Sequence, residues 1–340
     1  MCQMIPPFIL TIVIPTFRRA ACLKILLSSI TSDISDFPTD LEIIVLDNAS
    51  PDNTENIVSE FANTFPIKYF RHDENIGMDG NIAACFNVAS GKYLWVLGDD
   101  EILYKGTLNY VLNLCRNREF GILYIENDGF RDGEGMTIAL RSIPENIKIK
   151  ILNSETIFRE VNVFLTFISA NIVNRAEILR KFPEFDFRSD TGTFLPQMAW
   201  MYSVLKAADS HIYIYTPMFG AMTGNTGGYR LIQVFGVNLI NITKKYFAED
   251  SFAAANIMSN AVVTRLLPGE LMHQFGDAAS KSNFEYEDIN AMIDSCFGSN
   301  KYGNIFLKGI LSNSKLRREV SFFSVRVLNK INKILHYALL

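Results

Sequence analysis

Three successive acidic residues, Asp99, Asp100 and Glu101, follow an apolar run that ends at Leu97. Neighbouring carboxylates repel one another, and in a partly buried cleft this repulsion is costly unless a cation neutralises it. Mg²⁺ or Mn²⁺ suits such a cluster, because hard divalent ions prefer oxygen ligands and complete their shell with substrate phosphates. The alternative is a solvated acidic turn that caps a helix beginning near Thr107.

A second polar group, Asp47-Asn48-Ala49-Ser50, follows another apolar run. Its carboxylate, amide and hydroxyl can exchange hydrogen bonds with a base or a ribose. Alternatively, Ser50 or Asp52 caps the next helix, which would still leave Asp47 available.

A third candidate is the segment Asn75–Asn81, which contains Gly77 and Gly80 and precedes a helical pattern. Glycines let the backbone approach a ligand closely, whereas Asp79 or Asn81 could serve only as a helix N-cap. The four histidines show no spacing typical of a metal site.

The elements that position these groups alternate between short apolar runs and amphipathic helical patterns, which is typical of a parallel sheet covered on both faces. Ligands of open α/β sheets bind at the carboxyl ends of the strands, so the polar loops should converge there. The predicted strands are Phe8–Ile14, Leu41–Leu46, Ile67–Phe70, Tyr93–Leu97, Ile122–Ile125 and Ile212–Tyr215.

Composition limits the classes of protein to which the chain can belong. The chain has 340 residues, 49% of them hydrophobic, and a net charge of -4, which gives no general attraction to nucleic acid. Five cysteines without a CxxC pair favour reduced thiols in the cytoplasm. No signal-like segment opens the sequence, and no run approaches the roughly 18 apolar residues of a membrane span.

Three regions are expected along the chain. Residues 1–120 should form one half of an α/β domain and carry the polar loops, residues 121–230 should form its second half, and residues 231–340 a mostly helical region. The last of these ends in a basic amphipathic pattern.

Four motifs together resemble the family 2 glycosyltransferases, which have the GT-A fold, a Rossmann-like nucleotide-diphospho-sugar transferase architecture. They are Ile12–Arg19, Asp47–Ser50, Asn75–Gly77 and Gly98–Glu101, in this order and spacing. The phrase Gly91–Glu101 is further similar to abequosyltransferase-like enzymes of bacterial O-antigen (lipopolysaccharide) biosynthesis.

The resemblance implies a site for a nucleotide-diphosphate sugar, with Mg²⁺ or Mn²⁺ on the diphosphate. It makes residues 1–120 the nucleotide-sugar-binding half and residues 121–230 the acceptor-binding half. Two departures are notable: Gly98 replaces the first acid of the usual Asp-x-Asp, which makes Asp100 the best match to the metal ligand, and Arg18 stands where many members have asparagine. The expected metal ligands are therefore Asp100 and Glu101. The expected nucleotide-sugar-binding residues are Pro15, Thr16, Phe17, Arg18, Asp47, Asn48, Ser50, Asn75, Gly77, Asn81 and Asp99.

The acceptor hydroxyl needs a base, because an alcohol is a poor nucleophile until its proton is being removed. Asp190 and Asp186 lie where such family members often place an acidic base, and we favour Asp190. Either could instead be a surface acid paired with Arg188. The resemblance implies inversion at the anomeric carbon.

Two other functions are considered. A nucleotidyltransferase would show a glycine-rich loop after its first strand, where this chain has Pro15–Arg19. A non-catalytic nucleotide-sugar-binding or scaffold protein is the alternative from a different class, and the intact acids at Asp99–Glu101 argue against it.

The C-terminus predicts peripheral contact with an anionic membrane, on the cytoplasmic face of the inner membrane, where a lipid-linked saccharide acceptor would be reached. The alternative is a helix that packs its apolar face on the protein's own core. The apolar positions are Val320, Phe323, Val327, Ile331, Ile334 and Ala338, and the basic ones are Lys315, Arg317, Arg318, Arg326, Lys330 and Lys333.

Overall fold

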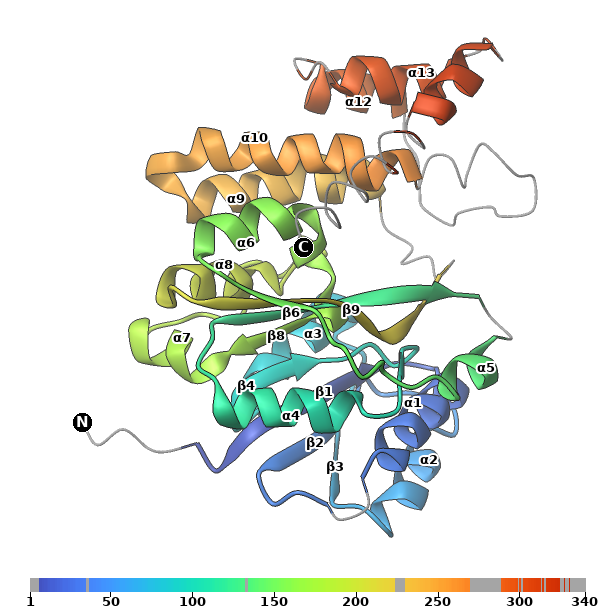
Figure 1. Cartoon of the computed structure of the whole chain (residues 1–340), viewed down its shortest axis with the longest axis vertical. Helices are drawn as coiled ribbons and strands as arrows, with labels where there is room; N and C mark the ends of the chain where they lie inside the picture. The colour runs from blue at the N-terminus through green and yellow to red at the C-terminus, as the bar shows by residue number, and fades with distance from the viewer. Residues whose placement is uncertain are drawn as a thin grey trace. The chain divides into compact units, whose positions relative to one another are not determined.

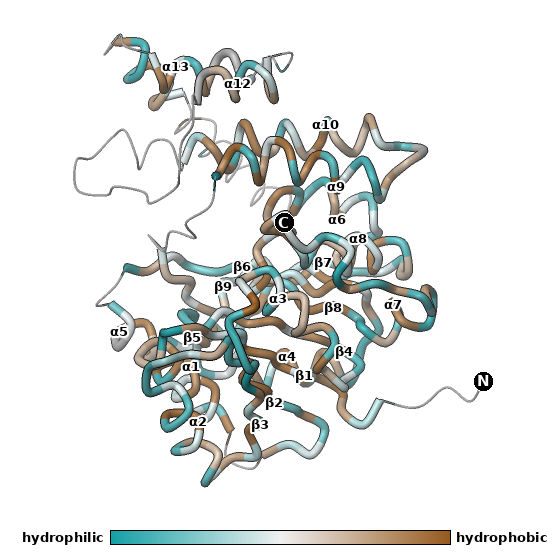
Figure 2. The backbone as a smooth tube through the Cα atoms, turned by 180° about the vertical axis from the view of Figure 1, so that it is seen from behind, coloured by the Kyte–Doolittle hydropathy of each residue, from teal (hydrophilic) through white to brown (hydrophobic). Residues whose placement is uncertain are grey.

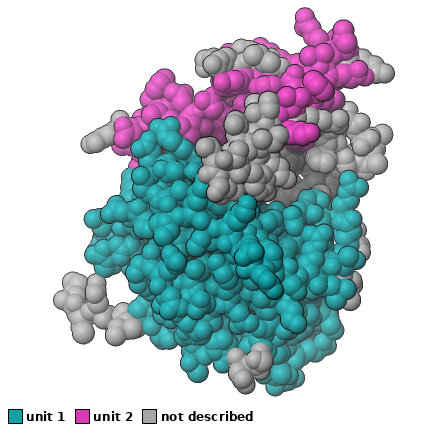
Figure 3. Space-filling model, in the orientation of Figure 1, with its two compact units in different colours: residues 1–223 teal, residues 224–340 magenta. Residues whose placement is uncertain are grey.

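The computed structural model describes residues 6–34, 37–131, 134–223, 230–269, 289–298, 300, 302–312, 314, 316–324, 327 and 330. Two compact units divide the chain, Met1–Thr223 and Gly224–Leu340 (Figure 3). The first unit therefore holds both the predicted donor half and most of the predicted acceptor half.

A mixed β-sheet forms the centre of the first unit, with the strand order β3-β2-β1-β4-β8-β6-β9-β5 and with β7 beside β9 (Figure 1). Its first four strands are parallel to one another, and β8 enters antiparallel between β4 and β6. The strands are β1 (Phe8–Thr16), β2 (Leu41–Asp47), β3 (Ile67–Arg71), β4 (Gly91–Val96), β5 (Ile102–Leu103), β6 (Ile122–Phe130), β7 (Ile149–Leu152), β8 (Asn171–Asn174) and β9 (His211–Met222).

Helices cover both faces of this sheet because its central strands are apolar on both sides (Figure 2). Helices α1, α2 and α4 lie together on one face, and α3, α7 and α8 lie on the other. The helices of this unit are α1 (Ala20–Ser32), α2 (Thr54–Ala62), α3 (Gly77–Val88), α4 (Thr107–Asn117), α5 (Gly135–Ala139), α6 (Ser154–Val161), α7 (Arg175–Lys181) and α8 (Met198–Ala207).

The amphipathic spacing predicted for α1 is confirmed, since Leu23, Leu26, Leu27 and Ile30 are all fully buried. Burying one such side chain contributes on the order of 2 kcal/mol, so this stripe fixes the helix on the sheet.

The described residues of the second unit are mostly helical, as the sequence predicts. Of the helices that the structure describes, none combines the length and the apolar character needed to cross a membrane. Those with defined bounds are α9 (Leu239–Tyr246), α10 (Ser251–Ala261), α12 (Ile289–Phe297) and α13 (Lys308–Ile310), with π-helical turns at Gln233–Asn238, Val262–Leu266 and Gly303–Leu307.

A buried histidine joins β9 to β6 and α6. The Nδ1 atom of His211 accepts a hydrogen bond from the Ile122 amide at 3.0 Å, and its Nε2 atom lies 3.0 Å from the Ser154 hydroxyl. The Ser154 hydroxyl itself donates to the Ala208 carbonyl, so Nε2 must carry the ring proton. Complete burial lowers the pKa of His211 to about 4.

We expect this histidine to make the protein acid-labile. Unfolding lets the imidazole take up a proton at its ordinary pKa of about 6.5, so stability is retained above that pH and lost as pH falls toward 4. From the 2.5-unit difference, the free energy of unfolding should fall by about 3 kcal/mol at pH 4. His211→Gln keeps an acceptor but does not titrate. Urea unfolding at pH 7 and pH 4.5 should show a weaker pH dependence for this variant, and an equal dependence would contradict the assignment.

Candidate active site

The polar loops meet because β1, β2, β3 and β4 are parallel and end at the same edge of the sheet. In the ladder, Thr16 pairs with Asp47 and Asp47 pairs with Arg71, while Val13 pairs with Val96 just before the acidic turn. The convergence predicted from the sequence is therefore present in the structure.

The acidic turn after β4 is held by Thr16, the last residue of β1, and by Arg19, which directly precedes α1. The hydroxyl of Thr16 donates to Asp99 Oδ2 at 2.7 Å. One nitrogen of Arg19, Nη1, lies 3.1 Å from Asp99 Oδ1 and 2.7 Å from Asp100 Oδ2. Two carboxylates thus face a single cationic position, at the junction of the first and fourth strands.

Burial raises the pKa of Asp99 to about 6, while Arg19 and the Thr16 hydroxyl act in the opposite direction and Asp100 adds to the rise. Its side chain is only 7% exposed. The anionic form of Asp99 therefore depends on the cation beside it.

Glu101, the second metal ligand expected from the sequence, is buried beside the acidic turn. Only 4% of the residue is exposed, and its Oε1 accepts a hydrogen bond from the Ser169 hydroxyl at 2.9 Å. Ser169 in turn accepts one from the Gly98 amide. Burial, reinforced by Asp100, raises the pKa of Glu101 well above its usual range. Through Ser169, Glu101 supports the acidic turn, and its role as a metal ligand stays a prediction.

The glycine that replaces the usual first acid has a local reason. A Cβ atom at Gly98 would lie 3.2 Å from Asp100 Oδ1 and 3.2 Å from Glu101 Oε1. An acidic side chain here would add charge and bulk against both carboxyls.

The acidic turn does not cap the helix at Thr107, which was the alternative from the sequence. The carboxylate of Asp33, at the end of α1, accepts the Gly106 amide at 2.6 Å and the Leu108 amide at 3.0 Å. Asp33 therefore accepts the backbone amides at the start of α4, and Asp99 and Asp100 do not cap this helix.

Within the described parts of the chain, no three histidine, cysteine, aspartate or glutamate side chains meet in an arrangement that could hold a metal ion. The pair Asp99 and Asp100 nevertheless offers oxygen atoms that already converge on one cationic nitrogen. Mg²⁺ is commonly held by one or two carboxylates together with substrate phosphates, so the donor set fits such an ion.

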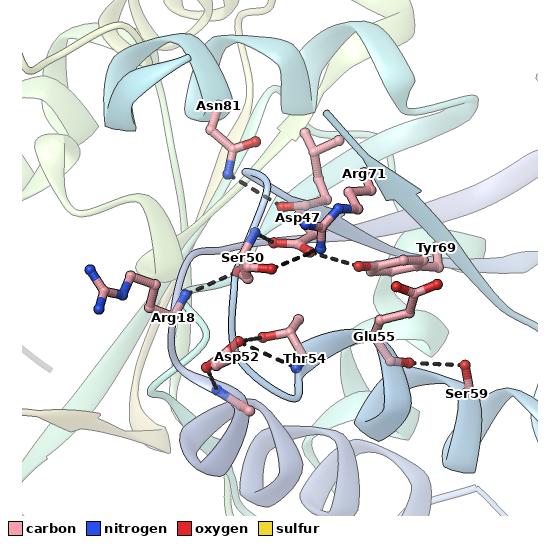
Figure 4. Close-up of polar contacts among 12 residues, drawn as sticks. Arg18, Asp47, Ser50, Asp52, Thr54, Glu55, Ser59, Tyr69, Arg71 and Asn81 are labelled. Atoms are coloured by element: carbon pink, nitrogen blue, oxygen red, sulfur yellow. Dashed lines mark hydrogen bonds and ion pairs between the residues drawn. The ribbon is translucent and has the colours of Figure 1, made fainter. Parts of the chain in front are cut away.

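Asp47 is the centre of a buried network (Figure 4). Its Oδ2 atom accepts hydrogen bonds from the Tyr69 hydroxyl at 2.6 Å and from Arg71 Nη1 at 3.0 Å, and its Oδ1 atom accepts the Ser50 amide at 3.0 Å. The residue is 0% exposed. The carboxylate is therefore covered and accepts three hydrogen bonds within the protein, and its expected contact with a base stays a prediction.

The residues after β1 form a tight turn against the residues after β2. Arg18 has a φ of 58°, and its amide donates to the Ser50 hydroxyl at 3.0 Å (Figure 4). Pro15 lies within β1, and Phe17 is half-buried. The guanidinium of the exposed Arg18 lies 5.9 Å from the centroid of the Phe17 ring. Ser50 therefore shapes this turn and does not cap α2.

The loop before α3 is tied to the end of β2 by Asn48, which is 3% exposed. Its side chain donates to Asn75 Oδ1 at 2.9 Å and to the Gly77 carbonyl at 3.1 Å, and it accepts the Ile76 amide at 2.9 Å. Gly77 has a φ of 79°, a conformation that favours glycine.

Asn81 was expected at the nucleotide, but the structure buries it. It is 4% exposed, donates to the Leu46 carbonyl at 3.3 Å, and lies 3.1 Å from His72 Nε2. The N-cap of α3 is Ile76, so neither Asn81 nor Asp79 caps this helix.

The two candidate bases differ in exposure. Asp186 is exposed, and its Oδ1 atom accepts the Arg188 amide at 2.9 Å, which is a local turn contact. Asp190 is 3% exposed, and its carbonyl accepts the Thr193 hydroxyl. The structure assigns Asp186 a turn-forming contact and places Asp190 inside the fold.

Four residues of this region were not selected as site residues from the sequence: Arg19, Tyr69, Arg71 and Ser169. Tyr69 and Arg71 alternate along β3 and so point to one face, a pattern that could have been read from the sequence. Ser169 is 68 residues from Glu101, and nothing local signals their contact.

The sequence model for glycosyl transferase family 2 matches residues 11–182 of this chain. The abequosyltransferase RfbV of Salmonella typhimurium is 36% identical over 124 residues, which are 33% of this chain and 37% of that protein. A GalNAc(5)-diNAcBac-PP-undecaprenol beta-1,3-glucosyltransferase of Campylobacter jejuni is 34% identical over 125 residues, 35% of this chain and 40% of that protein. The chain thus matches well under half the length of these curated relatives.

Among solved structures, residues 1–349 of Staphylococcus aureus TarS superpose with a TM-score of 0.56 at 15% identity, over 94% of this chain and 91% of that chain. The same protein in complex with UDP-GlcNAc gives a TM-score of 0.54. This likeness confirms the α/β GT-A fold with a helical C-terminal region that the sequence predicts.

Proposed function

Because this chain belongs to glycosyl transferase family 2, we propose that it transfers a sugar from a nucleotide-diphosphate donor to a glycan acceptor. The observation that carries this proposal is the carboxylate pair at the end of β4, where Thr16 and Arg19 hold Asp99 and Asp100 at the ligand edge of the sheet.

The donor diphosphate would lie at this acidic turn. Asp100, assisted by Asp99 or Glu101, would hold Mg²⁺ or Mn²⁺, and such an ion neutralises charge that builds on a leaving diphosphate. Arg19 adds a fixed positive charge to the same place. Thr16 keeps Asp99 oriented, and the turn formed by Phe17 and Arg18 would border the nucleotide.

In the reaction, an acceptor hydroxyl oxygen bonds to the anomeric carbon while the bond from that carbon to the diphosphate oxygen breaks. The hydroxyl proton passes to a carboxylate, for which we propose Asp190, and the nucleoside diphosphate leaves with the electron pair. A direct displacement of this kind inverts the anomeric centre.

We place the acceptor among the lipid-linked saccharides of bacterial surface polysaccharide biosynthesis, O-antigen assembly in particular. The names of the two curated relatives support this class, since one is an abequosyltransferase and the other acts on a saccharide linked to undecaprenol.

A screen of the purified full chain against nucleotide-sugar donors tests the proposal. Release of nucleoside diphosphate should require one donor and increase on adding a lipid-linked saccharide. A chain that binds a nucleotide sugar but never releases the diphosphate would instead be a binding protein, and release of pyrophosphate from a nucleoside triphosphate would indicate a nucleotidyltransferase.

We further propose that the C-terminal helix contacts an anionic membrane. Residues 316–324 are helical, and one face of this helix exposes Leu316, Val320 and Phe323 by 71%, 56% and 69%. Val327, 38% exposed, continues this face. Such exposure supports a membrane contact over packing on the protein's own core, while Ile331, Ile334 and Ala338 lie outside the described residues.

Positive charge accompanies this apolar face. Between Ser312 and Leu340 the chain has six basic residues and one acid, Glu319. Each basic residue near an anionic surface contributes about 1 kcal/mol, so the contact should be reversible and sensitive to salt. We infer that the enzyme works on the cytoplasmic face of the inner membrane.

The double variant Val320→Asp/Phe323→Asp should therefore lose most of its sedimentation with liposomes that contain phosphatidylglycerol. Phe252→Asp is the matched control, because Phe252 is also exposed, by 80%, but lies on α10. Equal binding of the double variant and wild type would exclude this helix as the anchor.

A further inference from the structure

An aspartate in the first turn of α3 binds the acceptor-side loop. The Oδ2 atom of Asp79 accepts the Gly192 amide at 2.7 Å and the Phe194 amide at 2.8 Å, across more than 110 residues of sequence. Two amides of one loop therefore converge on a single carboxylate oxygen.

The loop has an unusual backbone that depends on this carboxylate. Gly192 has a φ of 85° and Phe194 a φ of 61°. The left-handed conformation costs a residue such as phenylalanine roughly 1–2 kcal/mol. Left-handed residues at alternate positions turn successive amides to the same side and create a concave site for an anion. The carboxylate of Asp79, which belongs to α3, fills this site.

The same helix turn is fixed on its other side to the donor loop. Asn48, which follows β2, binds Asn75, Ile76 and the carbonyl of Gly77, the first residue of α3. The first turn of α3 thus contacts a donor-side loop through Asn48 and the acceptor-side loop through Asp79.

A second anchor holds the beginning of the acceptor-side loop. The Phe86 ring of α3 lies 4.9 Å from the Phe185 ring and 6.4 Å from the Phe187 ring, measured between centroids. Asp190 lies between this aromatic anchor and the amides bound by Asp79. Loss of Asp79 should therefore release one end of the loop while the aromatic end stays packed.

From this geometry we propose that Asp79 is a positioning residue, which fixes the segment 190–194 on α3 so that Asp190 is correctly placed for the acceptor. The proposal rests on the proposed function. It assigns no contact between Asp79 and substrate: Asp79 acts through the loop. A displacement of about 1 Å can lower a rate by roughly 10²-fold, so the loop need not unfold to matter.

The kinetic test uses the donor identified in the screen and compares Asp79→Ala, Asp79→Asn and wild type. Asp79→Ala should lower kcat/KM for the acceptor by roughly 10²-fold, with donor affinity and slow donor hydrolysis close to wild type. Asp79→Asn keeps an oxygen that can accept both amides, so it should recover most of the activity. Asp73→Ala, which removes an exposed acid from the preceding loop, is the matched control.

A second readout does not require activity. Hydrogen exchange of residues 190–196 in the unliganded protein should be faster in Asp79→Ala than in wild type and Asp79→Asn. Unchanged exchange would overturn the anchoring, and faster exchange with unchanged acceptor kinetics would overturn the positioning role. If wild type uses no donor, the proposed function and the positioning role both fail, whereas the exchange result still decides whether Asp79 holds the segment.

Discussion

Asp100→Ala should reduce sugar transfer by roughly 10²- to 10³-fold, the loss typical when one group that stabilises transition-state charge is removed. The fold should survive, because Arg19 retains its contact with Asp99 at 3.1 Å and Thr16 retains its hydrogen bond to Asp99. The same variant should bind Mn²⁺ more weakly, which can be measured by the electron paramagnetic resonance of the free ion without any turnover.

Asp100→Asn separates charge from shape, since it keeps the size of the side chain, and it should be nearly as impaired as the alanine variant. Glu60→Ala, which removes an exposed acid paired with Lys24 on α1, should behave as wild type. Full activity of Asp100→Ala, or of wild type in excess EDTA, would disprove the metal assignment.

Asp190→Asn should slow the chemical step by roughly 10²- to 10⁴-fold, as expected when a general base is lost. The amide has nearly the same volume as the carboxylate, so packing around this residue, which is 3% exposed, should persist. Single-turnover rates measure the chemical step directly, and equilibrium binding of the donor should be little changed.

Asp186→Asn is the matched control, because Asp186 is exposed and its carboxylate accepts a hydrogen bond from the neighbouring Arg188 amide. It should retain most of the activity. A loss in Asp186→Asn with a normal rate in Asp190→Asn would transfer the role of the base to Asp186.

The parallel half of the fold could be predicted because β1, β2 and β4 are mostly apolar runs bounded by polar loops. The predicted strand Leu41–Leu46 is one residue shorter than β2, and Phe8–Ile14 is two residues shorter than β1. Short strands gave no such pattern: β5 has only two residues, and β8 is Asn-Ile-Val-Asn. Their existence depends on neighbours that are distant in sequence.

The site could be predicted where polar residues stand at the end of an apolar strand. Thr16, Asp99 and Asp100 meet as expected, because strand ends of a parallel sheet lie at one edge. The role of Asp79 was not predictable, since its partners at residues 192 and 194 belong to a loop with no periodic pattern. Asp47 was placed correctly at a strand end, but its burial depends on Tyr69 and Arg71.

The strand order of the sheet has a consequence for synthesis on the ribosome. One edge of β4 pairs with β1, and the other edge pairs with β8. Because β8 begins 75 residues after Val96, it is synthesised much later than β4. At about 5–20 residues per second, this apolar strand keeps an open edge for roughly 4–15 s. β5 remains unpaired for longer, because its neighbour β9 begins 108 residues after Leu103, whereas β7 precedes β9 by only 59 residues. The nascent chain therefore passes through a stage in which its donor half is folded and one edge is exposed to other chains, a stage at which a chaperone would have most effect.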